Sequence, residues 1–315
     1  MFSNSTLTTT KERLASAIGH WSPPWRPAVE KLHQAPDHYV LTETHGAVCV
    51  LTLNDPGTRN SLSSALAAEL IAKVEAFDED PALKVLILTG TGPAFCSGFN
   101  VGEFAAELQD LEEAGASPQP RTWEQLDPAC TTAVNGRRTP LNTWDIVVKL
   151  MGLQKPVIAA VNGPATGLGL GMALCCDIRV ASERAVFKES FVNMGIPPGD
   201  GSAWTLQRIV GSGNAMLMQL TGDTIGAQEA YRIGLVSRLT SPDDLLATAL
   251  ELAQRIAKGS SMAHAMTKLL ARKAQNENFT EHLWEAQRAF AIAQAGSDHK
   301  EGVRAFLEKR EPKFS

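Results

Sequence analysis

Residues 157–181 read VIAAVNGPATGLGLGMALCCDIRVA and combine two apolar runs with a glycine-rich turn and a further apolar segment. The run at 157–161 predicts a strand that is buried on both faces, because five consecutive apolar residues leave it no polar side. The glycines at 163–171 predict a turn that opens a packed helix, and residues 177–181 predict the next strand. A strand, a helix and a strand in this order favour a mostly parallel sheet.

The same order of elements occurs earlier in the chain. Residues 48–53 (VCVLTL) and 84–89 (KVLILT) predict strands. Five apolar residues between them recur at helical spacing: Leu62, Leu66, Leu70, Val74 and Phe77. The pair Asn60-Ser61 is expected to begin this helix. Because ligands bind beyond the carboxyl ends of parallel strands, the segments that follow 84–89 and 157–161 are the first candidates for a functional site.

Three regions differ in composition. Residues 1–36 contain closely spaced prolines and are expected to form an extension that either packs on the main body or is partly disordered. Residues 37–223 carry the strand and helix units and are expected to form the core. Residues 224–315 are rich in Ala, Leu, Lys and Glu and predict a helical region. The long connection at 103–145 is expected to be a functional or mobile loop.

Composition excludes several classes of protein. The 315 residues are 44% hydrophobic and carry a formal charge of −5, which fits a folded protein and gives no broad basic surface for nucleic acid. The longest apolar tract, at 157–176, is interrupted by Asn162, Pro164 and glycines, so no membrane span is expected. Five cysteines without a disulfide-like arrangement, and no secretory signal, favour a reducing, cytoplasmic location.

Two glycine-containing loops follow the predicted strands. They read GPAFCSGFNV at 92–101 and NGPATGLGLG at 162–171. Backbone amides in such loops can face a ligand, and the amides that open a helix favour negative charge. The two loops could therefore each donate one N–H to a developing oxyanion. Close packing of a helix on the sheet explains the glycines equally well.

Other common chemistries do not fit the sequence. Met172 stands where a dinucleotide-binding G-x-G-x-x-G pattern needs its last glycine, and no Lys-Ser or Lys-Thr follows to make a phosphate loop. The seven histidines are scattered, so no metal site is expected, and no G-x-S-x-G motif occurs. Cys96 has no neighbouring base in the sequence, and a packed side chain is favoured over a nucleophile.

Several ordered segments resemble one family. They are FCSGFNV (95–101), KPVIAAVNGPATGLGLGMALCCDIRVASERAVF (155–187), GIPPGDGSAWTLQRIVG (195–211), AQEAYRIGLVSRL (227–239) and EGVRAFLEKREPKF (301–314). Together they resemble the crotonase superfamily, also called the enoyl-CoA hydratase/isomerase family. The resemblance implies an α/β spiral of ββα units, related to the ClpP fold, with a C-terminal helical trimerisation region. It also implies an acyl-CoA substrate, no cofactor beyond the coenzyme A of that substrate, and a homotrimer or dimer of trimers.

The resemblance assigns roles to residues of both loops. The backbone amides of Phe99 and Leu168 are expected to form an oxyanion hole that stabilises the enolate of the thioester. Six residues around them are expected to contact the substrate: Cys96, Ser97, Gly98, Gly167, Gly169 and Phe191. Arg59 and Asn60 resemble the family's R-N-A-L segment and are expected near the CoA nucleotide, although an arginine in solvent at a helix start fits equally well.

The acid and base positions depart from the family. Typical hydratases have glutamates at the positions that match Gly171 and Phe191, and neither residue here can transfer a proton. Glu189 and Asp200 are the carboxylates that could replace them. A surface position fits Glu189 equally well. Asp200 lies between two glycines, so it is either a helix cap or a presented catalytic side chain.

Three functions follow from these residues. The favoured one is an enoyl-CoA hydratase/isomerase-type reaction, with hydration or dehydration first, that uses Asp200, with or without Glu189, for proton transfer. The second is retro-Claisen hydrolysis of a cyclic β-diketone, because Pro-Gly-Asp-Gly resembles a branch with a catalytic aspartate there. That branch has a histidine where this chain has Phe191. The third is a non-catalytic protein that binds acyl-CoA.

Overall fold

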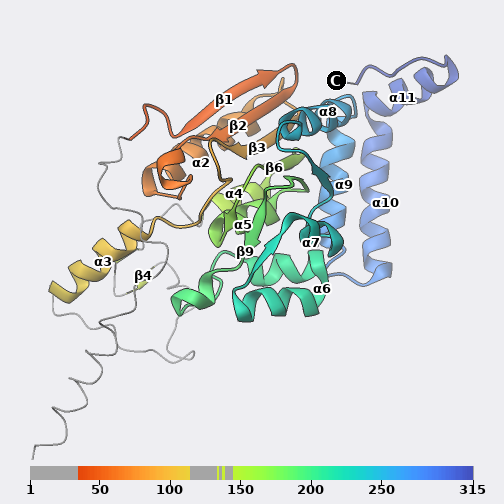
Figure 1. Ribbon diagram of the computed structural model, residues 1–315. Helices are drawn as coiled ribbons and strands as arrows, with labels where there is room; N and C mark the ends of the chain where they lie inside the picture. The colour runs from red at the N-terminus through yellow and green to blue at the C-terminus, as the bar shows by residue number, and fades with distance from the viewer. Residues whose placement is uncertain (1–34, 114–132, 135–136, 139–144, 315) are drawn as a thin grey trace, which may run out of the picture. The chain divides into compact units, whose positions relative to one another are not determined.

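The centre of the protein is a six-stranded sheet in the order β1-β2-β3-β6-β8-β11 (Figure 1). The computed structural model describes residues 35–113, 133–134, 137–138 and 145–314. The strands are β1 (Val40–His45), β2 (Val48–Leu53), β3 (Val85–Gly90), β6 (Val157–Val161), β8 (Ile178–Ser182) and β11 (Arg238–Thr240). All neighbours pair in parallel except β1 and β2. The four strands predicted from apolar runs are therefore confirmed, each within one residue of its expected position.

Both faces of the central strands β2, β3, β6 and β8 are buried, and alternate residues of these strands enter different cores. In β2, for example, Cys49 and Leu51 face one core, whereas Val48 and Val50 face the other. The first core is covered by α2 (Ser64–Glu79), α4 (Asp145–Gly152) and α5 (Leu168–Cys175), and the second by α8 (Leu245–Ala257). This double cover explains why the strands read as continuous apolar runs.

The start of α2 differs from the prediction. Helix α2 begins at Ser64, and Ser63 caps it by accepting a hydrogen bond from the Leu66 amide at 3.2 Å. The predicted start at Asn60-Ser61 is wrong, because Arg59 and Asn60 both have left-handed backbone angles, with φ of 59° and 55°. A left-handed residue cannot continue into a right-handed helix.

A second sheet and the C-terminal helices follow the core. The small sheet has the order β10-β9-β7, formed by β7 (Ala165–Thr166), β9 (Val186–Lys188) and β10 (Thr224–Gly226). The 3₁₀ helix η4 (Phe191–Met194) and the kinked helix α6 (Ser202–Thr221) lie between β9 and β10. The remaining helices are α7 (Ala227–Arg232), α9 (Ser261–Lys273), α10 (Phe279–Ala295) and α11 (Ser297–Leu307). The region 224–315 is thus mostly helical, as predicted, but it also supplies β10 and β11.

The segment at 103–145 is only partly a loop. Helix α3 (Val101–Glu113) covers its beginning, and β4 (Ala133–Val134) pairs with β5 (Arg137–Arg138) further along. The rest of this segment and the extension predicted at 1–36, except its last two residues, lie outside the described residues. The domain boundaries after residues 36 and 223 stay predictions.

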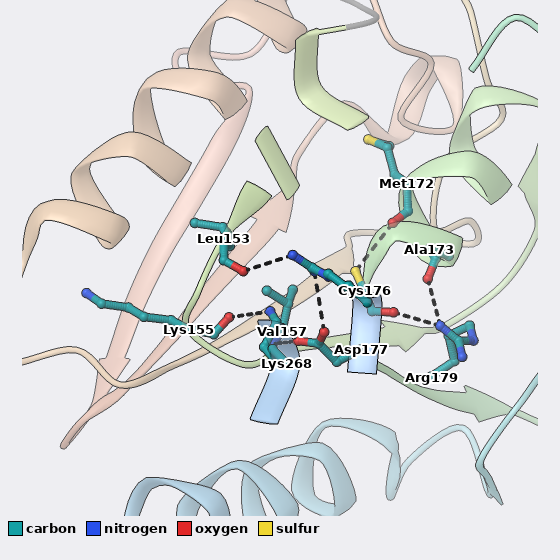
Figure 2. A network of polar contacts seen from close by, with 10 residues as sticks. Leu153, Lys155, Val157, Met172, Ala173, Cys176, Asp177, Arg179 and Lys268 are labelled. Carbon is teal, nitrogen blue, oxygen red and sulfur yellow. Dashed lines mark hydrogen bonds and ion pairs between the residues drawn. The ribbon is translucent and has the colours of Figure 1, made fainter. Parts of the chain in front are cut away.

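An ionic network fixes α9 against the start of β6 (Figure 2). The Asp177 carboxylate accepts hydrogen bonds from the Val157 amide at 2.8 Å and pairs with Lys268 Nζ at 2.6 Å. Lys268 also donates to the Lys155 carbonyl at 2.7 Å. Burial lowers the pKa of Lys268, and the nearby Asp177 opposes that shift. The network therefore joins the C-terminal helices to the sheet by charge as well as by apolar contact.

Buried Arg179 fixes the end of α5 (Figure 2). Its guanidinium donates to the carbonyls of Cys176 at 2.8 Å and of Ala173 at 3.4 Å, and also to the Leu235 carbonyl at 2.6 Å. A cation at a helix C-terminus satisfies carbonyls that have no partner within the helix. No helix among the described residues is long and apolar enough to cross a membrane.

Candidate active site

The two glycine-containing loops lie side by side. The Cys96 amide donates to the Pro164 carbonyl at 3.1 Å, and the Thr166 amide donates to the Cys96 carbonyl at 3.0 Å. A Cβ atom on Gly169 would lie 2.8 Å from the Cys96 Cβ and closer still to its carbonyl oxygen. The glycine is therefore needed for the close approach of α5 to this loop. The structure accordingly supports the packing explanation for this glycine.

The same contact brings the two predicted oxyanion residues together. A Cβ atom on Gly98, the neighbour of Phe99, would lie only 3.7 Å from the Leu168 nitrogen. The opposite side of the Phe99 segment pairs with Leu62, whose amide donates to the Gly98 carbonyl at 2.7 Å. Leu168 is the first residue of α5, where a helix leaves its amides without an intrahelical acceptor and favours negative charge. The Leu168 amide therefore lies where a helix favours a nearby negative charge.

The side chain of Asn60 holds the first of these loops in place by hydrogen bonds. Its side chain is buried, accepts from the Asp55 amide at 2.8 Å, and donates to the carbonyls of Ala94 and Thr91 at 2.9 and 3.0 Å. The polar atoms of the Asn60 side chain are thus bonded to backbone groups of other residues, whereas a contact with CoA was expected. Arg59 is exposed, as a contact with a nucleotide would require.

Ser97 and Cys96 also make contacts within the protein, and their predicted contact with substrate stays a prediction. The Ser97 hydroxyl donates to the Thr58 carbonyl at 3.1 Å and so holds the loop in place. The Cys96 side chain is fully buried, and burial raises the pKa of its thiol to about 12. A thiol that is protonated and enclosed is a poor nucleophile. The packed role favoured for Cys96 agrees with this position.

Asp200 presents a carboxyl group beside the first turn of α5. It is only 4% exposed, and its Oδ1 accepts from the Ser202 amide at 2.9 Å. Its Oδ2 has no hydrogen-bond partner among the described residues. A Cβ atom on Gly171 would lie 2.8 Å from the Asp200 Cγ and closer to Oδ2. The carboxyl thus occupies the space that a side chain at 171 would fill. One oxygen accepts from the first amide of α6, and the other faces α5.

Glu189 forms a buried pair with Asp200. It is 1% exposed, its Oε2 accepts from the Ser202 hydroxyl at 3.1 Å, and its Oε1 has no partner among the described residues. Burial, followed by the charge of Asp200, raises the pKa of Glu189 to about 8. Burial also raises the pKa of Asp200, which the bonds from Ser202 oppose. The pair therefore retains a proton at neutral pH. The surface position considered for Glu189 does not occur.

Phe191 places an aromatic side chain beside the second loop. Gly167 has a left-handed φ of 51°, and a Cβ atom there would lie 2.9 Å from the Ser190 hydroxyl and 3.9 Å from the Phe191 ring. Phe191 is itself buried. The position that carries a glutamate in typical hydratases, according to the family resemblance, is therefore an apolar wall here. Such a wall favours the neutral form of nearby carboxyl groups.

Sequence reasoning missed two features of this site. Ser202 bonds to both carboxyl groups, and Gly171 makes room for one of them. The Asp200-Gly201-Ser202 order is a signal for a cap, but nothing in it indicates a contact with Glu189. No cluster of three or more His, Cys, Asp or Glu that could hold a metal ion occurs in the part of the chain that the structure describes.

Comparison with known proteins identifies the family. The family model for enoyl-CoA hydratase/isomerase matches residues 43–139 and 135–315. The chain is 33% identical to crotonyl-CoA hydratase of Syntrophomonas wolfei over 87% of this chain and 97% of that protein. It is 35% identical to 2,3-dehydroadipyl-CoA hydratase of Escherichia coli over 85% and 94% of the respective chains.

Solved structures show the same fold. The crystal structure of enoyl-CoA hydratase from Bacillus anthracis matches with a TM-score of 0.75 and 29% identity, and the match covers 88% of this chain and 99% of that one. The expected crotonase fold is therefore confirmed. Since the family model spans most of the described chain and the relatives align over nearly their full length, this chain is an enzyme of the enoyl-CoA hydratase/isomerase family.

Proposed function

We propose that this enzyme adds water to the double bond of an enoyl-CoA thioester, or removes it in the reverse direction. The observation that carries the proposal is the buried pair of Glu189 and Asp200, bridged by Ser202 and set against the first turn of α5. Leu168 and Gly171 are three residues apart on that helix and share one face. The Asp200 carboxyl therefore lies beside the first turn of α5, the helix that begins at Leu168.

The chemistry needs one base, one acid and one oxyanion site. The thioester oxygen accepts hydrogen bonds from the amides of Phe99 and Leu168, which stabilise negative charge as the enolate forms. Ionised Asp200 takes a proton from water, and the water oxygen bonds to the β-carbon. Glu189, which retains its proton near neutral pH, supplies the proton for the α-carbon. Asp200 gains a proton and Glu189 loses one, so the number of protons on the pair is unchanged.

The proposal needs no cofactor, because coenzyme A enters as part of the substrate. Exposed Arg59 is the residue we assign to the CoA nucleotide. We place the enzyme in the cytoplasm, since Cys49, Cys96, Cys175 and Cys176 are free and buried, which suits a reducing compartment.

We also propose a homotrimer or a dimer of trimers. Large apolar side chains are exposed on the three C-terminal helices: Met262, Leu269, Phe279, Leu283, Trp284, Phe290, Ile292, Val303, Phe306 and Leu307. Helices with one apolar stripe gain stability when that stripe is buried against another surface. A second copy of the chain is the partner we assign to it.

A retro-Claisen hydrolase remains the second candidate because Asp200 is presented between two glycines, as in that branch. Phe191 lacks the imidazole that the branch uses, which is why hydration is favoured. Thermal stabilisation separates the two. Coenzyme A at 100 times its dissociation constant should add about 2.7 kcal/mol to the free energy of unfolding. Stabilisation by a CoA-free cyclic diketone instead would transfer the assignment to the hydrolase.

Asp200→Asn tests the proposed chemistry. Asparagine keeps the shape and the acceptor for the Ser202 amide but removes the proton acceptor. Hydration of crotonyl-CoA, followed by loss of the conjugated thioester absorbance, should fall by roughly 10²–10⁴-fold with little change in KM. Asp223→Asn, an exposed site just beyond the other end of α6, is the matched control. Unchanged turnover in Asp200→Asn would show that Asp200 only accepts the hydrogen bond at the start of α6. A parent protein that binds acyl-CoA but does not turn it over would be the non-catalytic alternative.

A further inference from the structure

We infer that Ser202 is a positioning residue that holds the two carboxyl groups together and lets Glu189 lose and regain its proton in place. Ser202 opens α6, and its side chain is fully buried. Its amide donates to Asp200 at 2.9 Å, and its hydroxyl donates to Glu189 at 3.1 Å. One residue thus contacts both members of the pair through two different groups. The kinetic part of this inference rests on the proposed function, whereas the proton distribution does not.

The amide and the hydroxyl of Ser202 differ in the hydrogen bonds that they can make. A backbone amide can only donate, so the Asp200 Oδ1 must remain an acceptor, and any proton on this carboxyl has to sit on Oδ2. A hydroxyl can donate or accept. The Glu189 Oε2 therefore keeps its hydrogen bond whether Glu189 is ionised or protonated. The hydroxyl and the amide of Ser202 both lower the pKa of Asp200, whereas Glu189 keeps its hydrogen bond to the hydroxyl in either form.

Glu189 has no other hydrogen-bond partner among the described residues that could replace the Ser202 hydroxyl. Its other oxygen, Oε1, lacks a hydrogen-bond partner among the described residues, and the whole side chain is 1% exposed. Without the Ser202 hydroxyl, a buried carboxylate would have neither oxygen bonded, which strongly disfavours the charged form. The hydroxyl is thus what allows Glu189 to lose and regain a proton in place.

Neither of the titratable groups described next to Glu189 lowers the pKa of that carboxyl. The charge that acts on Glu189 is that of Asp200, at the start of α6. On the side of α5, the neighbouring titratable group is the Cys175 thiol, whose pKa is raised to about 12 by burial and by Asp200. This thiol stays neutral across the working range of pH. A hydrogen bond from Ser202 is accordingly the interaction that lowers the pKa of Glu189.

Ser202→Ala tests the inference directly. Alanine keeps the backbone amide and removes only the hydroxyl. The infrared C=O band of protonated Glu189, assigned by its loss in Glu189→Gln, should titrate about one pH unit higher in Ser202→Ala. The pH dependence of kcat/KM for crotonyl-CoA should move in the same direction. A merely structural role would lower activity or stability without moving this titration.

Two variants serve as comparisons. Ser202→Thr keeps a hydroxyl at the same atom and should restore the parent titration. Thr205→Ala removes a hydroxyl one turn later on α6, where it donates to the Gly201 carbonyl at 3.3 Å, and should leave the titration unchanged. If Ser202→Ala does not fold, Ser202→Cys, a weaker donor of similar size, should move the titration upward by less.

An unmoved titration in Ser202→Ala, or in Ser202→Cys if that is the folded variant, would overturn the inference. The result differs from failure of the proposed function. If the parent does not hydrate crotonyl-CoA but the infrared band moves as expected, Ser202 still controls the pair and only the reaction assigned to it is wrong. If the parent hydrates crotonyl-CoA and the band does not move, the reaction stands and Ser202 has no such role.

Discussion

Adding one methyl group at Gly171 should displace the carboxyl group of Asp200. The new Cβ would lie 2.8 Å from the Asp200 Cγ and 3.3 Å from its Cβ, and closer still to Oδ2. Asp200 is enclosed at 4% exposure, so its carboxyl has to leave its position and give up the bond to the Ser202 amide. Gly171→Ala should therefore lower turnover of crotonyl-CoA roughly 10²-fold although it replaces neither proposed catalytic carboxyl.

The cost in stability can be worked out from the same contact. Overpacking of this kind costs about 1–3 kcal/mol. The lost hydrogen bond to the Ser202 amide costs about 1 kcal/mol, and replacing a helical glycine with alanine returns about the same amount. The net loss should be about 1–3 kcal/mol. In an Asp200→Ala background the collision is absent, so Gly171→Ala should instead stabilise by up to about 1 kcal/mol.

Urea unfolding of the parent, the two single variants and the double variant measures this coupling. Gly302→Ala is the control, because it lies within α11 and its Cβ would meet only the Phe314 ring at an ordinary 3.6 Å. It should be neutral or slightly stabilising. If Gly171→Ala behaves like Gly302→Ala and the cycle is additive, the carboxyl of Asp200 does not occupy the space beside Gly171.

Three further outcomes are expected. Glu189 has a folded pKa of about 8 against an ordinary 4.5, so the stability that its proton provides is present below about 4.5 and lost as the pH rises through 8; Glu189→Gln should flatten this dependence by on the order of a few kcal/mol in urea unfolding across that range. Asp177→Asn should cost about 1–3 kcal/mol in the same assay, because it leaves the enclosed Lys268 ammonium without its opposite charge, and adding Lys268→Met should recover part of the loss. Phe290→Glu and Phe306→Glu, at side chains 65% and 83% exposed, should lower the mass in light scattering while helical content stays constant; a parent that is already monomeric would refute the proposed assembly.

The sheet could be predicted from the sequence because its signal is local. Strands buried on both faces are apolar at nearly every position, and the runs at 48–53, 84–89 and 157–161 show this directly. The start of α2 could not be predicted in the same way. Asn60 and Ser63 are both residue types that cap helices, and the choice depends on the left-handed backbone at Asn60, which its bonds to the distant loop at 91–95 hold in place.

The candidate site, too, could be predicted only in part from the sequence. Asp200 could be proposed from the Pro-Gly-Asp-Gly pattern, and the two loops from their places after strands. Burial of Glu189 could not be predicted, because Lys188 and Ser190 on either side of it suggest a surface strand. What encloses Glu189 is the start of α6, which the chain reaches only after η4. A contact between elements that far apart leaves no periodic signal in either segment.

Gly171 and Asp200 are best understood as one unit. Read alone, Gly171 and Phe191 look like the loss of two glutamates, and that loss suggests a protein without catalytic activity. In the folded chain, however, the absent side chain at 171 is what admits a carboxyl from the start of α6 to the same face of α5. Glu189, held by Ser202, adds a second carboxyl near the buried ring of Phe191. Two buried carboxyl groups are therefore kept together at the start of α6, one of them beside the first turn of α5, although both come from new positions in the chain. Because proton transfer depends on where the oxygens lie rather than on which residue carries them, this arrangement favours an active enzyme over a binding protein.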